Sequence, residues 1–369
     1  MELFNRVYSN LQASRDKVLN GGINCIPTNF TRFSKEFPGI EQKTYAIVTA
    51  NSKVGKTQIT DYMFLYMPIL YAFAHQDQLN VKIIYFTLEM SQEQKYIQFM
   101  SFLLYWLSHG KIRVEPKELR SVSKVVDEDI LRILNSVEYK IYFDFFEKHV
   151  TFIDNIKNPF GIFKICKDYA LANGKQHKKT ITITNNKTGE VQENVEIDDY
   201  YEPDNPDEYV IVILDHMALL TPENGQSLRE AMVKLSYEYF VALRNKYHYI
   251  IAAVVQQAAS QESVENFRLN QLKPTANGLG EAKILSRDCD IMFGLFSPFR
   301  HSIPSYEEYD ITKFRDNIRF LEIIQAREGG GGSVCPLFFD GGVNFFAELP
   351  LPNDQKGLEI AYETIRKLR

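Results

Sequence analysis

The chain lacks the features that mark several specialised classes of protein. Its 369 residues include only four cysteines (Cys25, Cys166, Cys289 and Cys335), which lie far apart and match no metal-ligand spacing. We therefore expect reduced, mostly buried thiols, as in a cytosolic protein. No apolar run reaches the ~18 residues of a membrane span, and residues 1–20 lack the apolar core of a signal peptide. The sequence thus predicts a cytoplasmic protein without a membrane partner.

An excess of basic residues is also missing. Lys and Arg number 42 against 47 Asp and Glu, which gives a net charge of −5. This balance argues against a broad basic surface that wraps nucleic acid, although it leaves room for a few basic loops inside a ring. The hydrophobic share of 45% and the charged share of 24% are typical of a globular protein. The length suits one large α/β domain or two small ones.

The most informative stretch is residues 50–57 (ANSKVGKT). It follows an apolar run at residues 45–49 that is typical of a buried strand, and it precedes residues 58–67, which have the apolar content of a helix. Gly-Lys-Thr alone is a weak signal, but this strand, loop and helix order is the context of a phosphate-binding P-loop. The candidate ATP-binding residues are Ala50, Asn51, Ser52, Lys53, Val54, Gly55, Lys56 and Thr57.

Each residue type in this loop suits the chemistry of a nucleotide triphosphate. Gly55 allows the backbone to pass close to the phosphates, and Lys56 supplies a positive charge that can reach the β and γ oxygens. Thr57 offers a hydroxyl to Mg²⁺. Ala50 stands where a first glycine is usual, which the backbone tolerates if its φ stays negative.

Polar residues follow three further apolar runs. Residues 81–88 lead into Glu89, residues 209–214 into Asp215, and residues 249–255 into Gln256. Parallel sheets place functional groups at the carboxyl ends of their strands. Taken alone, Glu89 is more typical of a capping or surface residue, whereas an acid at Asp215 downstream of a P-loop is typical of a magnesium-side carboxylate.

Two segments do not fit a compact core. Residues 178–195 alternate polar and β-branched residues around a turn sequence, which predicts an exposed hairpin followed by an acidic loop, so residues 175–207 are interpreted as an insertion. Residues 258–283 form a long polar segment, and such segments are usually functional or disordered. Its basic residues Arg268, Lys273 and Lys283 are candidate DNA contacts.

Near the beginning of the chain, residues 2–20 predict an amphipathic helix, docked either on its own domain or on a neighbouring subunit.

Several of these strands and loops together resemble the RecA-like motor domain of DnaB-type replicative helicases, of superfamily 4. The matching segments, in family order, are residues 26–33 (IPTNFTRF), 50–57, 86–90 (FTLEM), 213–216 (ILDH), 255–257 (VQQ), 286–293 (SRDCDIMF) and 324–329 (IQAREG). The family often has alanine at the position of Ala50. The resemblance implies an α/β fold with a RecA-like P-loop NTPase core, a mostly parallel sheet flanked by helices, and an inserted β-hairpin.

The resemblance also implies roles for the candidate residues. Glu89 would be the general base that orients the attacking water, Asp215 with Thr57 would lie beside Mg²⁺, and Gln256 would sense the γ-phosphate. Arg327 would be an arginine finger that reaches the nucleotide of the adjacent subunit. The implied cofactors are ATP and Mg²⁺. The implied partners are single-stranded DNA, further copies of the chain in a hexamer, and a primase or helicase loader.

The chain departs from the family pattern at three places. Gln325 replaces a common lysine, His216 replaces a tyrosine after Asp215, and the N-terminal primase-interacting domain is missing. The expected organisation is a linker-type helix at residues 1–22, a motor domain at residues 23–348 and a tail helix at residues 349–369. So lean a motor suits a phage or plasmid replication system, and a phage protein would act in the host cytoplasm.

Three functions fit these observations. The first is a hexameric helicase motor that hydrolyses ATP, translocates 5′ to 3′ on single-stranded DNA and unwinds duplex. The second is a RecA-like ATPase that acts in recombination or assembly without unwinding. The third is a nucleotide-stabilised interaction platform, which has no need of a base such as Glu89.

Overall fold

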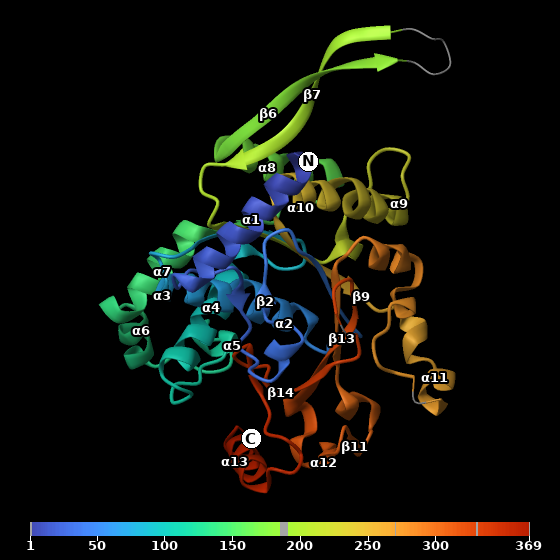
Figure 1. The fold of residues 1–369 in the computed structure, drawn as a ribbon. Coiled ribbons are helices and arrows are strands. Elements are labelled where there is room, and N and C mark those ends of the chain that lie inside the picture. Colours follow the sequence, from blue (N-terminus) through green and yellow to red (C-terminus); the bar gives the residue numbers. More distant parts are fainter. Residues whose placement is uncertain (1, 185–190, 270, 330, 369) are drawn as a thin grey trace.

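A nine-stranded sheet forms the centre of the computed structural model (Figure 1). The structure describes residues 2–184, 191–269, 271–329 and 331–368. In spatial order the strands are β15 (Phe345–Glu348), β14 (Val334–Asp340), β13 (Ile318–Ala326), β10 (Ile291–Phe296), β3 (Tyr45–Ala50), β9 (Ile250–Gln256), β8 (Glu208–Asp215), β4 (Asn80–Thr87) and β5 (Val150–Ile153). The strands from β10 to β5 are parallel, and β13, β14 and β15 continue the sheet antiparallel. The expected α/β fold with a mostly parallel sheet is confirmed.

Helices cover both faces of this sheet. The elements on one face are α2 (Lys56–Asp61), a π-helical turn (Tyr62–Tyr66), α3 (Met67–Ala74), α4 (Gln92–Leu107), α5 (Pro116–Leu119), α6 (Glu128–Leu134) and α7 (Val137–His149). The elements on the other face are α8 (Pro159–Ala172), α9 (Leu228–Val233), a second π-helical turn (Lys234–Phe240) and α10 (Val241–Tyr247). In β3, Ala46 and Val48 join the first core, whereas Tyr45 and Ile47 join the second. Because the central strands are buried on both faces, they are nearly continuous apolar runs in the sequence.

The hairpin formed by β6 (Gly174–Thr184) and β7 (Val191–Pro203) projects from the body of the molecule (Figure 1). Its turn, residues 185–190, lies outside the described residues. The expected acidic loop at residues 198–207 is only partly correct, because β7 continues to Pro203. The base of the hairpin also belongs to the core: Tyr201 is 6% exposed, and its hydroxyl donates to the carbonyl oxygens of Ala170 (2.9 Å) and Asn173 (3.2 Å).

Helix α1 (Glu2–Leu19) leaves its large apolar side chains exposed. They are Phe4, Val7, Tyr8, Leu11, Val18 and Leu19, with exposed fractions of 47 to 66%. Near its end, Lys17 forms an ion pair with Asp207. The interpretation that this helix packs its apolar face on its own domain is therefore wrong for this chain.

Two short ribbons and several helices lie outside the nine-stranded sheet. A short ribbon of β1 (Ile26–Pro27) and β2 (Gly39–Ile40) precedes β3. A second ribbon of β11 (Ser305–Tyr306) and β12 (Tyr309–Asp310), together with α12 (Ile311–Phe314) and the C-terminal helix α13 (Gln355–Lys367), packs in a third apolar cluster below β13. The polar segment at residues 258–283 contains α11 (Val264–Arg268) and part of a 3₁₀ segment (Asn277–Arg287). No helix within the described part of the chain is long and apolar enough to cross a membrane.

Candidate nucleotide site

The sheet brings four of the predicted site segments to one edge. The P-loop follows β3, Gln256 ends β9, Asp215 ends β8 and Glu89 lies two residues beyond β4. These four strands are consecutive and parallel, so their carboxyl ends meet. This is the edge at which open α/β sheets bind ligands.

The P-loop side chains contact the ends of the two adjacent strands. Gly55 has a φ of 106°, a conformation that favours glycine, and α2 begins at the next residue without a side-chain cap. The ammonium group of Lys56 lies 3.3 Å from Gln256 Oε1. The hydroxyl of Thr57 donates to Asp215 Oδ1 at 3.1 Å.

A hydroxyl and a carboxylate at this spacing fit a magnesium ion. Mg²⁺ is usually held by one or two protein oxygens together with waters and substrate phosphates. Consistently, no cluster of three or more metal-ligating residues occurs among the described residues. Thr57 and Asp215 are therefore the residues that could hold the ion, and the uncapped N–H groups at the start of α2 suit phosphate oxygens.

Glu89 lies in the turn between β4 and α4, and its side chain is 54% exposed. Its nearest basic group is His216, with Nε2 3.9 Å from the carboxylate. Burial and the nearby charge of Lys56 lower the pKa of His216 below its usual value, which favours the neutral imidazole at pH 7. His216 Nδ1 is buried and has no hydrogen-bond partner in the described structure. The structure thus brings Glu89 to the correct edge but not into contact with Lys56 or Thr57.

Arg327 is held away from the P-loop of its own chain. It follows the last residue of β13, and its side chain is 49% exposed. The guanidinium donates to the carbonyl oxygens of Arg287 (2.9 Å) and Asp288 (3.2 Å) and lies 3.3 Å from Asp290 Oδ1.

The neighbouring Gln325, which replaces the family lysine, donates to the carbonyl oxygen of Ser286. The side chains of Arg327 and Gln325 are therefore held by the segment of residues 286–290, before β10.

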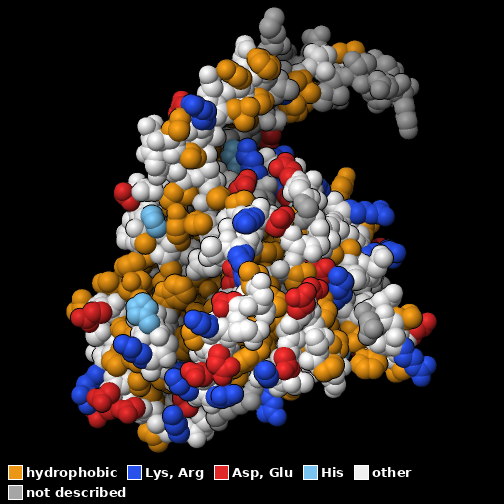
Figure 2. Space-filling model, turned by 60° about the horizontal axis from the view of Figure 1, so that its bottom comes forward, with side chains coloured by type: hydrophobic (Ala, Val, Ile, Leu, Met, Phe, Trp, Pro, Cys, Tyr) orange, Lys and Arg blue, Asp and Glu red, His pale blue; other side chains and the backbone are white. Residues whose placement is uncertain are grey.

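The three candidate DNA contacts lie in different parts of the polar segment. Lys273 is paired with Glu322 at 2.8 Å, whereas Arg268 ends α11 and Lys283 lies in the 3₁₀ segment. The segment is attached to β3 through Gln257, whose amide donates to Thr49 Oγ1 and to the carbonyl oxygen of Thr275, both at 3.0 Å. On the face drawn in Figure 2, basic and acidic side chains are interspersed, as the net charge predicts.

Two solved structures share this architecture. A solved ATPase domain aligns with a TM-score of 0.64 at 15% identity, and the alignment covers 95% of this chain and 98% of that one. A DnaB-like replicative helicase, described with its interactions with primase, aligns with a TM-score of 0.61 at 15% identity, over 94% of this chain and 66% of that one. This chain has the fold of a DnaB-type ATPase domain. Neither a protein-family model nor a curated protein sequence matches it.

The DnaB-type fold places several residues near the site that sequence reasoning missed. Arg319 is 1% exposed and donates from Nε to the carbonyl oxygen of Val54 at 2.7 Å, while its guanidinium lies over the ring of Phe339. Arg300 donates to the carbonyl oxygen of Ser52. Two arginines from the C-terminal third therefore hold the P-loop backbone. Nothing local in the sequence marks them, because Arg300 and Arg319 both lie far from the loop along the chain.

A second group joins the P-loop helix α2 to β4 and α4, and it consists of Asp61, Tyr85 and Lys95. A sequence signal existed for Lys95: it shares helical spacing with Phe99, Phe102 and Trp106, so it lies on the aromatic face of α4. A lysine on a core face must find a buried partner.

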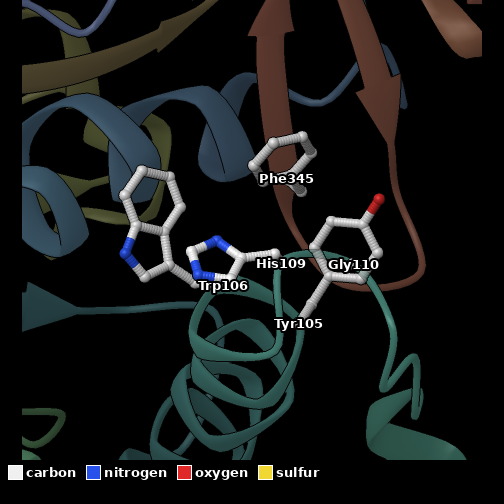
Figure 3. A pocket seen from close by; sticks show the side chains of 5 residues that line it. All are labelled: Tyr105, Trp106, His109, Gly110 and Phe345. Carbon is white, nitrogen blue, oxygen red and sulfur yellow. The ribbon is translucent and has the colours of Figure 1, made fainter.

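The pocket drawn in Figure 3 belongs to neither group. Tyr105, Trp106, His109, Gly110 and Phe345 line this hollow, which has a volume of about 280 Å³ between the end of α4 and β15. No candidate site residue lines it.

Proposed function

We propose that this chain is the ATP-hydrolysing motor of a ring-shaped DNA helicase. The observation that carries the proposal is the pairing of Lys56 with Gln256 and of Thr57 with Asp215 across adjacent strand ends. These contacts bring the phosphate-binding lysine next to the expected sensor, and they join the hydroxyl and the carboxylate that hold Mg²⁺ in P-loop ATPases. The shared fold with a DnaB-like replicative helicase supports a helicase-type motor, and the sequence resemblance implies DNA as the track and a hexamer as the assembly.

In this proposal the side chains have separate tasks. Lys56 reaches the β and γ phosphates, and Thr57 and Asp215 position Mg²⁺, which neutralises charge on the phosphate oxygens when bound. Glu89 takes a proton from the attacking water and orients it. Because its carboxylate is largely exposed, Glu89 has room to turn towards a bound nucleotide.

Arg327 and α1 support an oligomer. The side chain of Arg327 is held by residues 287–290 and not by the P-loop of its own chain, which suits an arginine finger that reaches the nucleotide of a neighbouring subunit. Exposed apolar residues along α1 suit a helix docked on an adjacent subunit, which supports the division into a linker helix (1–22), a motor (23–348, with 175–207 inserted) and a tail helix (349–369). A primase or loader as partner, movement 5′ to 3′ and action in the cytoplasm complete the proposal.

Three measurements on one preparation test this function. We expect ATP hydrolysis that single-stranded DNA stimulates, a hexamer by mass, and displacement of a strand from a forked duplex. The Lys56→Ala variant should lose nucleotide binding and the activities that depend on it. Hydrolysis without strand displacement would instead indicate a RecA-like assembly or recombination ATPase. Nucleotide binding without any turnover would indicate an interaction platform.

A further inference from the structure

A buried group of charges lies directly behind the proposed magnesium site. It consists of Asp61 in α2, Tyr85 in β4 and Lys95 in α4, and the side chains of Asp61 and Lys95 are fully buried. Lys95 Nζ lies 2.9 Å from Asp61 Oδ2 and 2.6 Å from the hydroxyl of Tyr85. Three separate elements of the core therefore meet at one ammonium group.

Asp215 links this group to the P-loop. Its Oδ1 accepts the hydrogen bond of Thr57 at 3.1 Å, whereas its Oδ2 lies 3.6 Å from Lys95 Nζ. The hydroxyl of Tyr85 lies between the two acids, 2.9 Å from Asp61 Oδ1 and 3.4 Å from Asp215 Oδ2. One oxygen of the carboxylate thus faces the nucleotide side, and the other faces the buried group. The side chains of Asp61 and Lys95 have no exposed surface, so Asp215 is the member of the group that also contacts the P-loop.

Such an arrangement is costly unless each charge is compensated. Burying an ammonium and two carboxylates removes their hydration, and the attraction between them offsets this only when the geometry is good. The fold could have filled this space with apolar side chains, as the rest of the α4 core face does with Phe99, Phe102 and Leu103. A polar group retained in this position fits a task in orienting its neighbours.

We propose that Lys95 is a positioning residue for the magnesium side of the site. Its ammonium, together with Tyr85, holds Oδ2 of Asp215 so that Oδ1 stays turned towards Thr57 and the ion. Asp61 balances the charge that Lys95 brings into the core. Since α4 starts just after Glu89, the same lysine ties the base-bearing turn to the P-loop helix. This inference rests on the proposed ATPase function.

The test compares two variants in the binding of a fluorescent ADP analogue at increasing Mg²⁺ concentration. Lys95→Met alone leaves two carboxylates buried without a counter-charge and is expected to lose thermal stability. The double variant Lys95→Met with Asp61→Asn removes one charge of each sign, so the net charge beside Asp215 stays the same. Methionine has nearly the volume of lysine, and the asparagine oxygen can still accept from Tyr85.

We expect the double variant to melt near the wild-type temperature and yet to need about 10- to 100-fold more Mg²⁺ for half-maximal nucleotide binding, as when an orienting partner of a metal ligand is lost. A merely structural lysine would give a double variant with the wild-type Mg²⁺ midpoint, and that result would overturn the proposal. The matched control is Lys234→Met with Glu223→Gln, which removes a partly exposed ion pair of 2.8 Å elsewhere and should leave the midpoint unchanged.

The outcomes also separate the two proposals. If the wild-type protein binds the analogue with Mg²⁺ and Lys56→Ala does not, the nucleotide site stands, and the Lys95 variants decide the inference alone. If the wild-type protein shows no binding that depends on Mg²⁺, the proposed function and the role of Lys95 both fall.

Discussion

Glu89 and Asp215 are both acids that follow a buried strand, but their surroundings differ sharply. Asp215 is 1% exposed and tied to Thr57, whereas the side chain of Glu89 is 54% exposed. A fixed carboxylate suits the holding of a cation, and an exposed one can turn to meet a water molecule at the γ-phosphate.

We therefore expect Glu89→Gln to bind ATP normally while hydrolysis falls by about 100-fold or more, because an amide cannot accept the proton. Rapid-mixing turnover and fluorescent nucleotide titration would measure the two effects separately. The control is Glu93→Gln, an exposed acid in the first turn of α4, which should hydrolyse ATP like the wild type. Near-normal turnover by Glu89→Gln would move the base elsewhere, and His216 would be the next residue to change.

At the residue scale, the sequence predicts those site residues whose neighbours in the chain form a recognisable pattern. The P-loop is marked by the strand and helix that flank it, and each polar residue is marked by the apolar run before it. The positions of Lys56, Thr57, Asp215 and Gln256 at strand ends could therefore be predicted from the sequence. Arg319 could not, because its role depends on a contact with Val54 that only the folded sheet creates. The DNA role of Lys273 also could not be judged from sequence, since its partner Glu322 lies in β13, far along the chain.

At the scale of elements, the strands were predicted well because buried parallel strands are continuous apolar runs. The expected strand at residues 45–49 matches β3 (Tyr45–Ala50), and the polar hairpin is present. The expectation for α1 stayed open because an amphipathic pattern does not say which surface will cover it. The hairpin and its loop were judged wholly exposed because Tyr201, which enters the core, lies beyond the alternating segment, among acidic residues that predict a loop.

The two ends of the hairpin should consequently behave differently. Deletion of residues 178–195 is expected to leave the thermal midpoint and ATP hydrolysis close to wild type, since exposed loop tips tolerate deletion. Tyr201→Ala should instead cost about 3 kcal/mol of unfolding free energy, because it empties a buried aromatic site. Tyr200→Ala, at an exposed neighbour, is the control for chemical denaturation. A deletion that unfolds the protein would show that the outer strands also support the domain.

At the scale of the whole molecule, the position of Arg327 predicts that hydrolysis depends on assembly. Lys56→Ala and Arg327→Ala should each be inactive, and mixing them with subunit exchange should restore activity. With random mixing about a quarter of interfaces keep both residues, so recovery should reach at most about that fraction of wild type. Coupled firing around the ring would lower it further.

Mass spectrometry of labelled subunits would verify the exchange. If the Arg327→Ala protein alone hydrolysed ATP at the wild-type rate, Arg327 would not be an arginine finger. A mixture that stays inactive despite verified exchange would place Arg327 in its own subunit's site, or show that one inactive site stalls the ring.

The place of β3 in the sheet has a consequence for biosynthesis. β3 is synthesised early, yet the strands that pair with it are β9 and β10. Tyr45 cannot pair until Ile251 has been synthesised, and Ala46 cannot complete its pairing until Ile291 has. On a ribosome that adds about 5–20 residues per second, the P-loop strand remains unpaired for about 10–40 s. The pair formed by β4 and β5 can assemble sooner. A nascent chain therefore cannot form the nucleotide site until its second half has emerged, and until then a strand that is fully buried in the folded protein remains open to aggregation.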